Sequence, residues 1–295
     1  MVCHATELLL FCFLCQTFGQ RLNNVYKKTQ GIRAQSTNVN LFHSPTLEDC
    51  LIHCELNSAT CKSLNFKESD GTCEALPGHN EATSVDSDWV FLILQAKSSC
   101  ADWKNKQLQS PSGTYIVDPD GPGGVTPFPV ECDMATTPPT VRVNHNQITR
   151  KHIVGYEDPN FYEHQLVYNG VTNPQLRALA TASSTCRQYV KKECYNACTF
   201  YYGTKCDFWT TLEGEQLEYW AGNGTTVTRG CACALSDTCA LGEPCNCDAN
   251  DNRWRTDEGY LTAKEHLPIS AVMIGDTGKS VEQVYITVGP LECTP

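Results

Sequence analysis

The sequence has no apolar stretch beyond residue 18 that is long enough to cross a membrane, and no basic run longer than two residues. A membrane-spanning helix needs about 20 apolar residues, so the sequence predicts no membrane span. The 22 Lys and Arg are outnumbered by 33 Asp and Glu, which gives a net charge of -11. This acidity argues against a nucleic-acid partner. It is compatible with calcium or basic partners and specifies neither.

Local signatures of catalysis are also missing. The sequence contains no HExxH motif and no GxSxG nucleophile elbow, and its 8 histidines are scattered. The segment 275–280 ends like a phosphate-binding loop, but that loop needs a glycine where Met273 stands. A surface turn between two strands explains the segment better. The sequence therefore predicts that the protein is not an enzyme. The remaining alternative is a catalytic Ser, His and Asp that lie far apart in the sequence and meet only in the folded chain.

A short apolar run at residues 8–18 is followed by small and polar residues. This layout is typical of a secretory signal peptide over residues 1–19, and a buried N-terminal helix is the alternative. Cleavage there removes Cys3, Cys12 and Cys15 from the 19 cysteines and leaves 16, an even number, as full pairing requires. Such density in an oxidising compartment means disulfides. The sequence thus predicts a secreted, extracellular protein.

Five cysteines stand between Cys231 and Asp248, with a Cys-x-Cys pair at each end. A zinc site would need Cys-x-x-Cys spacing or a histidine pair nearby, and the stretch offers neither. Disulfides are therefore the prediction for this stretch as well.

The first module is predicted over residues 22–97, and a helix begins the cysteine-bearing stretch at its centre. Thr46 can cap this helix, which carries Cys50 and Cys54 one turn apart and stops near Asn57. Because both cysteines lie on one side of the helix, we expect them to bridge to the same neighbouring element.

A hairpin follows the helix. It consists of an alternating strand at residues 61–66, a turn at Asp70-Gly71 and a returning strand with Cys73. Two cysteines one turn apart that face a hairpin indicate nested bridges. The predicted pairs are Cys50 with Cys73 and Cys54 with Cys61.

This order of Cys-x-x-x-Cys helix, cysteine strand, Asp-Gly turn and cysteine strand resembles the PAN/apple domain. The resemblance covers residues 22–97 and implies a small helix on an antiparallel sheet, with residues 89–94 as the last, buried strand. Fuller members of the family carry an outer bridge, and no cysteine between Arg21 and Asp49 is available for it. The module would be the two-bridge form.

The second module is predicted over residues 98–295. A strand, a Pro/Gly turn and a second strand between residues 112 and 134 would bring Cys100 beside Cys132, and this lead-in resembles the start of a fibrinogen C-terminal-like domain. The later motifs include Tyr219-Trp-Ala-Gly222, Cys231-Ala-Cys233, Cys245-Asn-Cys-Asp248, His266-Leu-Pro268 and Val288-Gly-Pro-Leu291. Together they are similar to the divergent fibrinogen-like domain of contactin-associated proteins, the neurexin-IV-type adhesion receptors.

The Val-Asp-Pro turn at 117–119 and the terminal Val-Gly-Pro resemble, more distantly, fibrillar-collagen C-propeptides. If that likeness extends to pairing, it implies a bridge from Cys194 to Cys247. Cys198 and Cys206 are absent from the contactin-associated pattern, which predicts that they pair with each other across a short loop. Six cysteines stay unassigned because they allow many connectivities. They are Cys186, Cys231, Cys233, Cys239, Cys245 and Cys293.

Two oxygen-rich loops are candidates for calcium. Asp118 and Asp120 lie where collagen C-propeptides bind calcium, so the resemblance implies a candidate calcium site at these two residues. Asp248, Asn250 and Asp251 place oxygens at alternating positions, which suits a cation that takes hard oxygen ligands. Neither loop completes an EF-hand pattern, and a solvated turn is the alternative for both.

The sequence predicts an α+β fold, in which a small helix-on-sheet module precedes a larger disulfide-rich module. Asn223-Gly-Thr225 is a glycosylation sequon with a permitted middle residue. Both resemblances imply a secreted, non-enzymatic recognition or adhesion protein that binds glycans or extracellular and cell-surface proteins and needs no cofactor other than calcium. The alternatives are a calcium-dependent innate-defence lectin and a structural matrix component. The sequence does not specify the oligomeric state.

Overall fold

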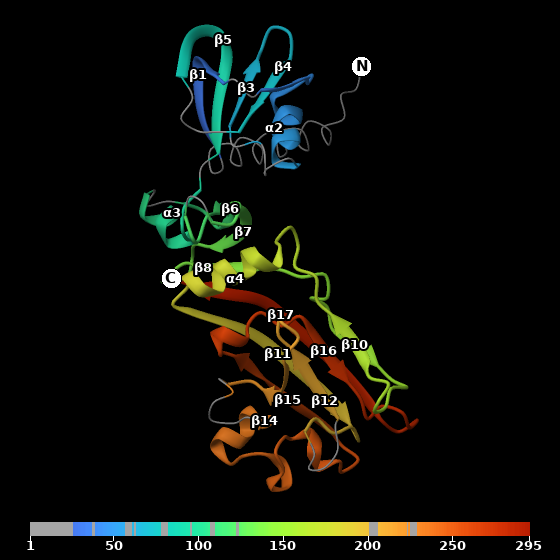
Figure 1. Ribbon diagram of the computed structural model, residues 1–295. Coiled ribbons are helices and arrows are strands. Elements are labelled where there is room, and N and C mark those ends of the chain that lie inside the picture. The colour runs from blue at the N-terminus through green and yellow to red at the C-terminus, as the bar shows by residue number, and fades with distance from the viewer. Residues whose placement is uncertain are drawn as a thin grey trace, which may run out of the picture. The chain divides into compact units, whose positions relative to one another are not determined.

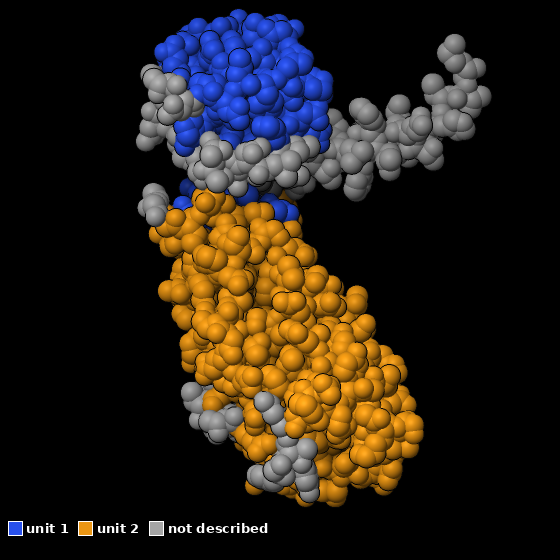
Figure 2. All heavy atoms as spheres, turned by 45° about the vertical axis from the view of Figure 1, so that its right-hand side comes forward, with its two compact units in different colours: residues 1–97, 114–118 blue, residues 98–113, 119–295 orange. Residues whose placement is uncertain are grey.

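The computed structural model describes residues 26–36, 39–56, 61, 63–77, 82–94, 96–106, 110–121, 124–200, 206–222, 224 and 229–295. The signal peptide predicted at residues 1–19 and the sequon residue Asn223 lie outside these residues. The chain forms two compact units, coloured separately in Figure 2. Unit 1 holds residues 1–97 and 114–118, and unit 2 holds residues 98–113 and 119–295.

Unit 1 is one antiparallel sheet with a helix (Figure 1). The strand order is β1-β5-β3-β4-β2. The elements are β1 (Tyr26–Gln35), β2 (Asn40–His43), α2 (Leu47–Leu56), β3 (Ser63–Lys67), β4 (Thr72–Leu76) and β5 (Ala82–Leu94).

Local signals explain where α2 begins and where the hairpin turns. The Asp49 backbone N–H donates to the Thr46 hydroxyl at 3.1 Å, which satisfies one of the free amides of the first turn. Between β3 and β4, Gly71 has φ +72°, and an added Cβ there would collide with the Ser44 carbonyl oxygen. Only glycine fits this turn without strain.

The core of unit 1 combines apolar packing with a buried polar network. Leu64, Val90 and Leu92 are fully buried together with the four cysteines of the two bridges. Asn65, also fully buried, exchanges two hydrogen bonds with the Ala34 backbone at 2.7 and 2.8 Å and donates to Glu74 at 2.8 Å. These hydrogen bonds join the outer strand β1 to the middle strand β3. Every buried polar group in the network has a partner, as buried polar groups normally do.

Unit 2 contains two sheets and short helical segments. The larger sheet has the order β15-β11-β17-β8-β7, with β9 also paired to β17, and the smaller has the order β10-β16-β12-β13-β14. The larger sheet is built from β7 (Phe128–Asp133), β8 (Thr140–Val143), β9 (Lys151–Ile153), β11 (Thr185–Tyr195), β15 (Trp254–Leu261) and β17 (Gln283–Thr294). The short strand β6 (Gly113–Val117) falls mostly within unit 1, which holds residues 114–118. The smaller sheet is built from β10 (Tyr162–Gln165), β12 (Asp207–Thr210), β13 (Gln216–Trp220), β14 (Arg229–Cys231) and β16 (Ala271–Ile274). The helical segments are α3 (Cys100–Lys106), α4 (Asn173–Ala182), η1 (Ala232–Ser236), η2 (Ala240–Gly242), η3 (Cys247–Ala249) and η4 (Lys264–His266).

Strand β11, which lies between β15 and β17, has one buried face and one solvent-facing face. Its residues alternate between buried and partly or fully exposed from Thr185 to Tyr195, as expected for a strand with one face on a core and the other toward solvent. Val190, Lys192 and Cys194 point to the buried side. We call the opposite, solvent-facing side of β11, β15 and β17 the open face.

The chain is richer in β-structure than the α+β class predicted from the sequence. Unit 1 does carry one helix against its sheet, but unit 2 is two sheets with short helices. The prediction overestimated the helical share because the strands of unit 2 pair across long sequence separations, which local patterns do not register. Thr185, for example, pairs with Thr294 across 109 residues.

A histidine in the smaller sheet should make stability depend on pH. His164 in β10 is fully buried, and burial, with the nearby His145 and Lys151 charges, lowers its pKa to about 4. The unfolded chain therefore binds more protons than the fold between pH 6.5 and 4, so the stability linked to this group is complete above pH 6.5 and falls on acidification.

We expect this slope to be absent in His164→Gln. Subtracting the unfolding free energies of the variant from those of the natural chain at each pH removes the contributions of other titrating groups. The difference should shrink by about 2–3 kcal/mol between pH 7 and 4. Urea titrations with the disulfides intact would measure it, and a difference that stays constant with pH would show that His164 titrates normally in the fold.

Candidate binding surface and the disulfide frame

The cysteines of the described residues form eight disulfides. In unit 1 the structure joins Cys50 to Cys73 and Cys54 to Cys61. In unit 2 it joins Cys100 to Cys132, Cys194 to Cys247 and Cys198 to Cys206. These five pairs are the same as the pairs expected from the sequence motifs.

The six cysteines that the sequence left unassigned also have partners in the structure. Cys186 bridges to Cys293, directly opposite it on the neighbouring strand β17. Cys231 bridges to Cys245, and Cys233 to Cys239. All 16 cysteines that follow Cys15 are therefore engaged as disulfides, so none of them is placed as a thiolate for catalysis or metal binding.

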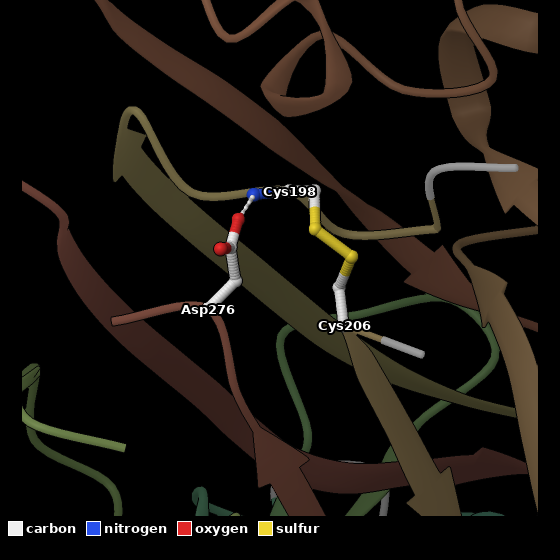
Figure 3. Close-up of side chains that lie close together, drawn as sticks. All are labelled: Cys198, Cys206 and Asp276. Atoms are coloured by element: carbon white, nitrogen blue, oxygen red, sulfur yellow. Dashed lines mark hydrogen bonds between the residues drawn. A yellow bond between two sulfur atoms is a disulfide. The ribbon is translucent and has the colours of Figure 1, made fainter. Parts of the chain in front are cut away.

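Two clusters of metal-ligating residue types contain bridged cysteines. Figure 3 shows one of them, in which the Asp276 carboxylate points at the loop closed by the Cys198–Cys206 disulfide. Its Oδ2 accepts the Cys198 backbone N–H at 2.7 Å. In the other cluster, Asp257 lies beside the Cys231–Cys245 bridge and accepts the Cys247 N–H at 2.8 Å. A disulfide sulfur is not a thiolate ligand, so both carboxylates hold the backbone of the frame.

Three of the five candidate calcium residues accept hydrogen bonds or an ion pair from protein donors. Asp248 is buried and its Oδ1 accepts the N–H groups of Thr199 and Phe200 at 2.7 and 3.0 Å. Asp251 pairs with Arg255 at 2.6 Å, and Asn250 takes a left-handed conformation after η3. In the other loop, the Asp120 carboxylate accepts the Val125 N–H at 3.0 Å, and the Asp118 N–H donates to the Lys97 carbonyl at 2.8 Å.

Calcium at either loop is a candidate with a solvated turn as its alternative, and chelation tells the two apart. Because Asp248, Asp251 and Asp120 are already held by protein donors, we expect the melting temperature to be the same in EDTA as in millimolar calcium. A bound ion would stabilise the fold by mass action. A melting temperature that rises with calcium would therefore assign an ion to one of the loops, and Asp120→Asn and Asp251→Asn would tell which.

An aromatic cluster occupies one end of the open face. Tyr195 of β11 and Trp254 of β15 form a cross-strand pair with ring centroids 5.6 Å apart. The Trp254 ring lies 5.7 Å from that of Tyr285 in β17, which stacks on His152 of β9 at 4.3 Å. Trp254 is 51% exposed. We call these four residues the Trp254 cluster.

A cation completes the cluster. The Arg150 guanidinium lies 3.4 Å from the centre of the Tyr285 ring and donates to Glu193 of β11 at 2.7 Å. The ion pair fixes the guanidinium over the ring, so the cation–π contact and the charge are held in one position. Exposed Trp, Tyr and Arg grouped in this way are the residue types that dominate the energy of protein interfaces.

A second group lies further along the same face. The Tyr189 and Tyr260 rings are 5.5 Å apart, and the Arg187 guanidinium lies 4.2 Å from the Tyr260 ring centre. Arg187 also donates to Glu292 at 2.8 Å. Tyr189 and Tyr195 are both on β11, so at 3.3 Å per residue the two groups are about 20 Å apart.

A cavity of about 250 Å³ opens beside Arg187. It is lined by Thr136, Thr137, Pro138, Thr140, Thr185, Arg187, Glu292 and Thr294. The hydroxyls pair with one another, Thr136 with Thr140 at 3.0 Å and Thr185 with Thr294 at 2.7 Å. Since a hydroxyl both donates and accepts, the lining suits a small polar ligand.

Behind the open face, a buried ion pair joins the two sheets of unit 2. Lys192 of β11 and Asp207 of β12 are both fully buried and form a salt bridge. Lys192 also donates to the Cys198 carbonyl, and Asp207 accepts the Gly275 N–H at 3.2 Å. The pair therefore fixes the strand that carries Tyr189 and Tyr195 against the smaller sheet.

The fold and its surface define a disulfide-braced, β-rich protein with an exposed group of aromatic and cationic side chains on the open face. Comparison with known families agrees. The model of the fibrillar collagen C-terminal domain matches residues 94–293, well over half of the chain, and the chain belongs to that family. The PAN domain model matches residues 15–90, in line with the resemblance seen in the cysteine motifs.

Several curated proteins are similar to the chain. Contactin-associated protein 1 of Homo sapiens is 35% identical over 240 residues, which is 78% of this chain and 17% of that protein. The Rattus norvegicus protein of the same name is 35% identical over 187 residues, 62% of this chain and 13% of that protein. Neurexin-4 of Drosophila melanogaster is 30% identical over 207 residues, 66% of this chain and 16% of that protein. The chain thus spans less than a fifth of the length of these relatives.

The part of the chain described by the structure contains no helix long and apolar enough to span a membrane.

Proposed function

We propose that this chain is a non-enzymatic recognition or adhesion protein that works outside the cell and binds its ligand through the open face. The observation that carries the proposal is the Trp254 cluster with Arg150 above it. The sixteen bridged cysteines support an extracellular location, since disulfides persist in oxidising compartments. Secretion through residues 1–19 and a glycan on Asn223 belong to the same proposal.

An extracellular protein is the first candidate ligand. The name of one relative supports it, since that name states an association with contactin. Trp, Tyr and Arg in one exposed group also match the composition of protein hot spots. A glycan is the second candidate, favoured by the polar cavity beside Arg187 and by aromatic rings that can stack on the C–H face of a sugar.

The test is a binding screen with the protein collected from culture medium. It would be applied to an array of purified extracellular domains that includes a contactin ectodomain, and to a glycan array with and without EDTA. We expect binding on at least one array and no hydrolysis of ester, peptide or glycoside substrates. The absence of binding on both arrays, together with a measurable hydrolase activity, would overturn the proposal.

A further inference from the structure

A second exposed surface lies in the cysteine-rich stretch of unit 2. Residues 231–245 form a loop that two disulfides close, Cys231–Cys245 and, inside it, Cys233–Cys239. We call it the braced loop. It projects two leucines into solvent, Leu235 at 49% exposure and Leu241 at 75%.

Leu241 is held in a backbone conformation that suits leucine poorly. Its φ and ψ are 57° and 14°, in the left-handed region. There the Cβ of an L-residue comes too close to the following carbonyl oxygen, so glycine or asparagine is normally found. The next residue, Gly242, has φ +76°. Two successive residues of the loop are therefore left-handed, and only the second is a glycine, the residue type that this conformation favours.

Packing does not explain this leucine. Most of its side chain is exposed, so it contributes little to the core, while its backbone position costs conformational energy. Where a sequence breaks a local rule without a gain in the fold, a functional contact is the expected reason. The fold also holds the loop in place, because the Cys231 N–H donates to the Pro244 carbonyl at 3.0 Å and the Ala240 N–H to the Asn246 side chain at 3.0 Å.

The charges around the leucines indicate the kind of partner. The sequence has no Lys or Arg from Cys231 to Asn252, and Asp237 and Glu243 flank the exposed leucines. Helices and loops that insert into membrane surfaces carry basic residues beside their apolar ones, and this loop carries acidic residues. The pattern is complementary to an apolar pocket with a basic rim.

We infer that the braced loop is a second docking site, in which Leu241, supported by Leu235, inserts into an apolar pocket with basic residues at its edge on another extracellular protein. The disulfides fix the loop before binding, so little conformational freedom is lost when the contact forms. The acidic residues select the partner and speed the encounter, so binding should weaken as salt rises.

The test uses variants whose effects on folding and on binding go in opposite directions. Leu241→Gly and Leu241→Asn remove the apolar side chain and relieve the backbone, so we expect an unchanged or higher melting temperature together with binding at least tenfold weaker to a basic domain on the array of extracellular domains. Leu241→Met keeps an apolar side chain and should bind within about threefold of the natural chain. Leu41→Gly, at an exposed leucine of unit 1, is the control for loss of a surface leucine.

The outcomes separate this inference from the function proposed for the open face. If Trp254→Ala abolishes binding to every array partner while Leu241→Gly and Leu241→Asn bind all of them as the natural chain does, the braced loop is not a docking site. Binding to phosphatidylcholine–phosphatidylserine vesicles that depends on Leu241, without any Leu241-dependent protein partner, would also overturn it. A natural chain that binds no domain on the array of extracellular domains contradicts the docking site at the braced loop, whereas its binding to the glycan array would leave the function proposed for the open face in place.

Discussion

Replacing Lys192 with methionine is expected to lower the free energy of unfolding by about 3–5 kcal/mol. The substitution leaves Asp207 fully buried without its cation. Burial raises the pKa values of the nearby Asp248 and Asp257, and the Lys192 charge opposes that rise. Removing one member of a buried pair exposes the full cost of keeping the other charge out of water. Urea denaturation at neutral pH with the disulfides intact would measure the loss.

The loss should also depend on pH in a defined direction. Burial raises the pKa of Asp207 to about 7, against the lowering effect of Lys192. A raised pKa in the fold means that the stability linked to this carboxyl is complete below about pH 4 and is lost as the pH rises through about 7. Without Lys192 the pKa rises further, so the deficit of Lys192→Met should be smaller at pH 5 than at pH 8.

The neighbouring lysine supplies the matched control. Lys191 lies on the open face, where it pairs with Glu258 at 3.8 Å, and an exposed pair of this kind contributes about 0–1 kcal/mol. Lys191→Met should therefore leave stability nearly unchanged. Adding Asp207→Leu to Lys192→Met should recover part of the loss, because an apolar pair can replace a buried ion pair. Equal losses for the two lysine variants would show that the Lys192–Asp207 pair does not hold the sheets together.

Replacing Trp254 with alanine is expected to weaken ligand binding by about 2 kcal/mol or more, which is roughly 30-fold. Trp254 lies between Tyr195 and Tyr285 at the centre of its cluster, and truncation removes the largest exposed ring on the open face. Surface plasmon resonance with the ligand found on the arrays would measure the change. Because the ring is half exposed, the variant should keep its fold and its melting temperature should change little.

A second exposed aromatic controls for this prediction. Tyr156 precedes β10 and its ring contacts that of Tyr162 at 5.2 Å, and it is not part of the Trp254 cluster. Tyr156→Ala should bind like the natural chain. If Tyr156→Ala and Trp254→Ala weaken binding equally, binding depends on exposed aromatic residues in general. The position of Trp254 on the open face would then not be what determines binding.

Sequence patterns were most informative in unit 1, because its signals are local. Thr46 caps the helix three residues before Asp49, and Asp70-Gly71 reverses the chain between two strands that share four residue pairs. The cysteine bridges of unit 1 close loops with separations of only 7 and 23 residues. Each of these features is set by residues at most 23 positions apart, and a sequence displays such features directly.

The open face could not be predicted because its parts meet only in the folded sheet. Arg150, Trp254 and Tyr285 come from the loop before β9, from β15 and from β17. The pairing of β17 with β9 and β11, and of β11 with β15, brings them together. The bridge between Cys186 and Cys293 has the same origin, since it joins strands 107 residues apart. A signal was nevertheless present. Alternation along residues 185–195 places Tyr189 and Tyr195 on the face opposite Lys192, and that pattern predicts a half-exposed strand carrying two tyrosines.

Side-chain oxidation footprinting of the protein with and without the ligand from the arrays tests the central claim most directly. The modification rate of each Trp and Tyr would be measured by mass spectrometry in the free and the bound protein. The account predicts that Trp254, Tyr285 and Tyr195 become protected when the ligand binds, while Tyr156 keeps its rate. A bound protein in which Trp254 and Tyr285 are modified as fast as in the free protein would contradict the assignment of the open face as the recognition surface.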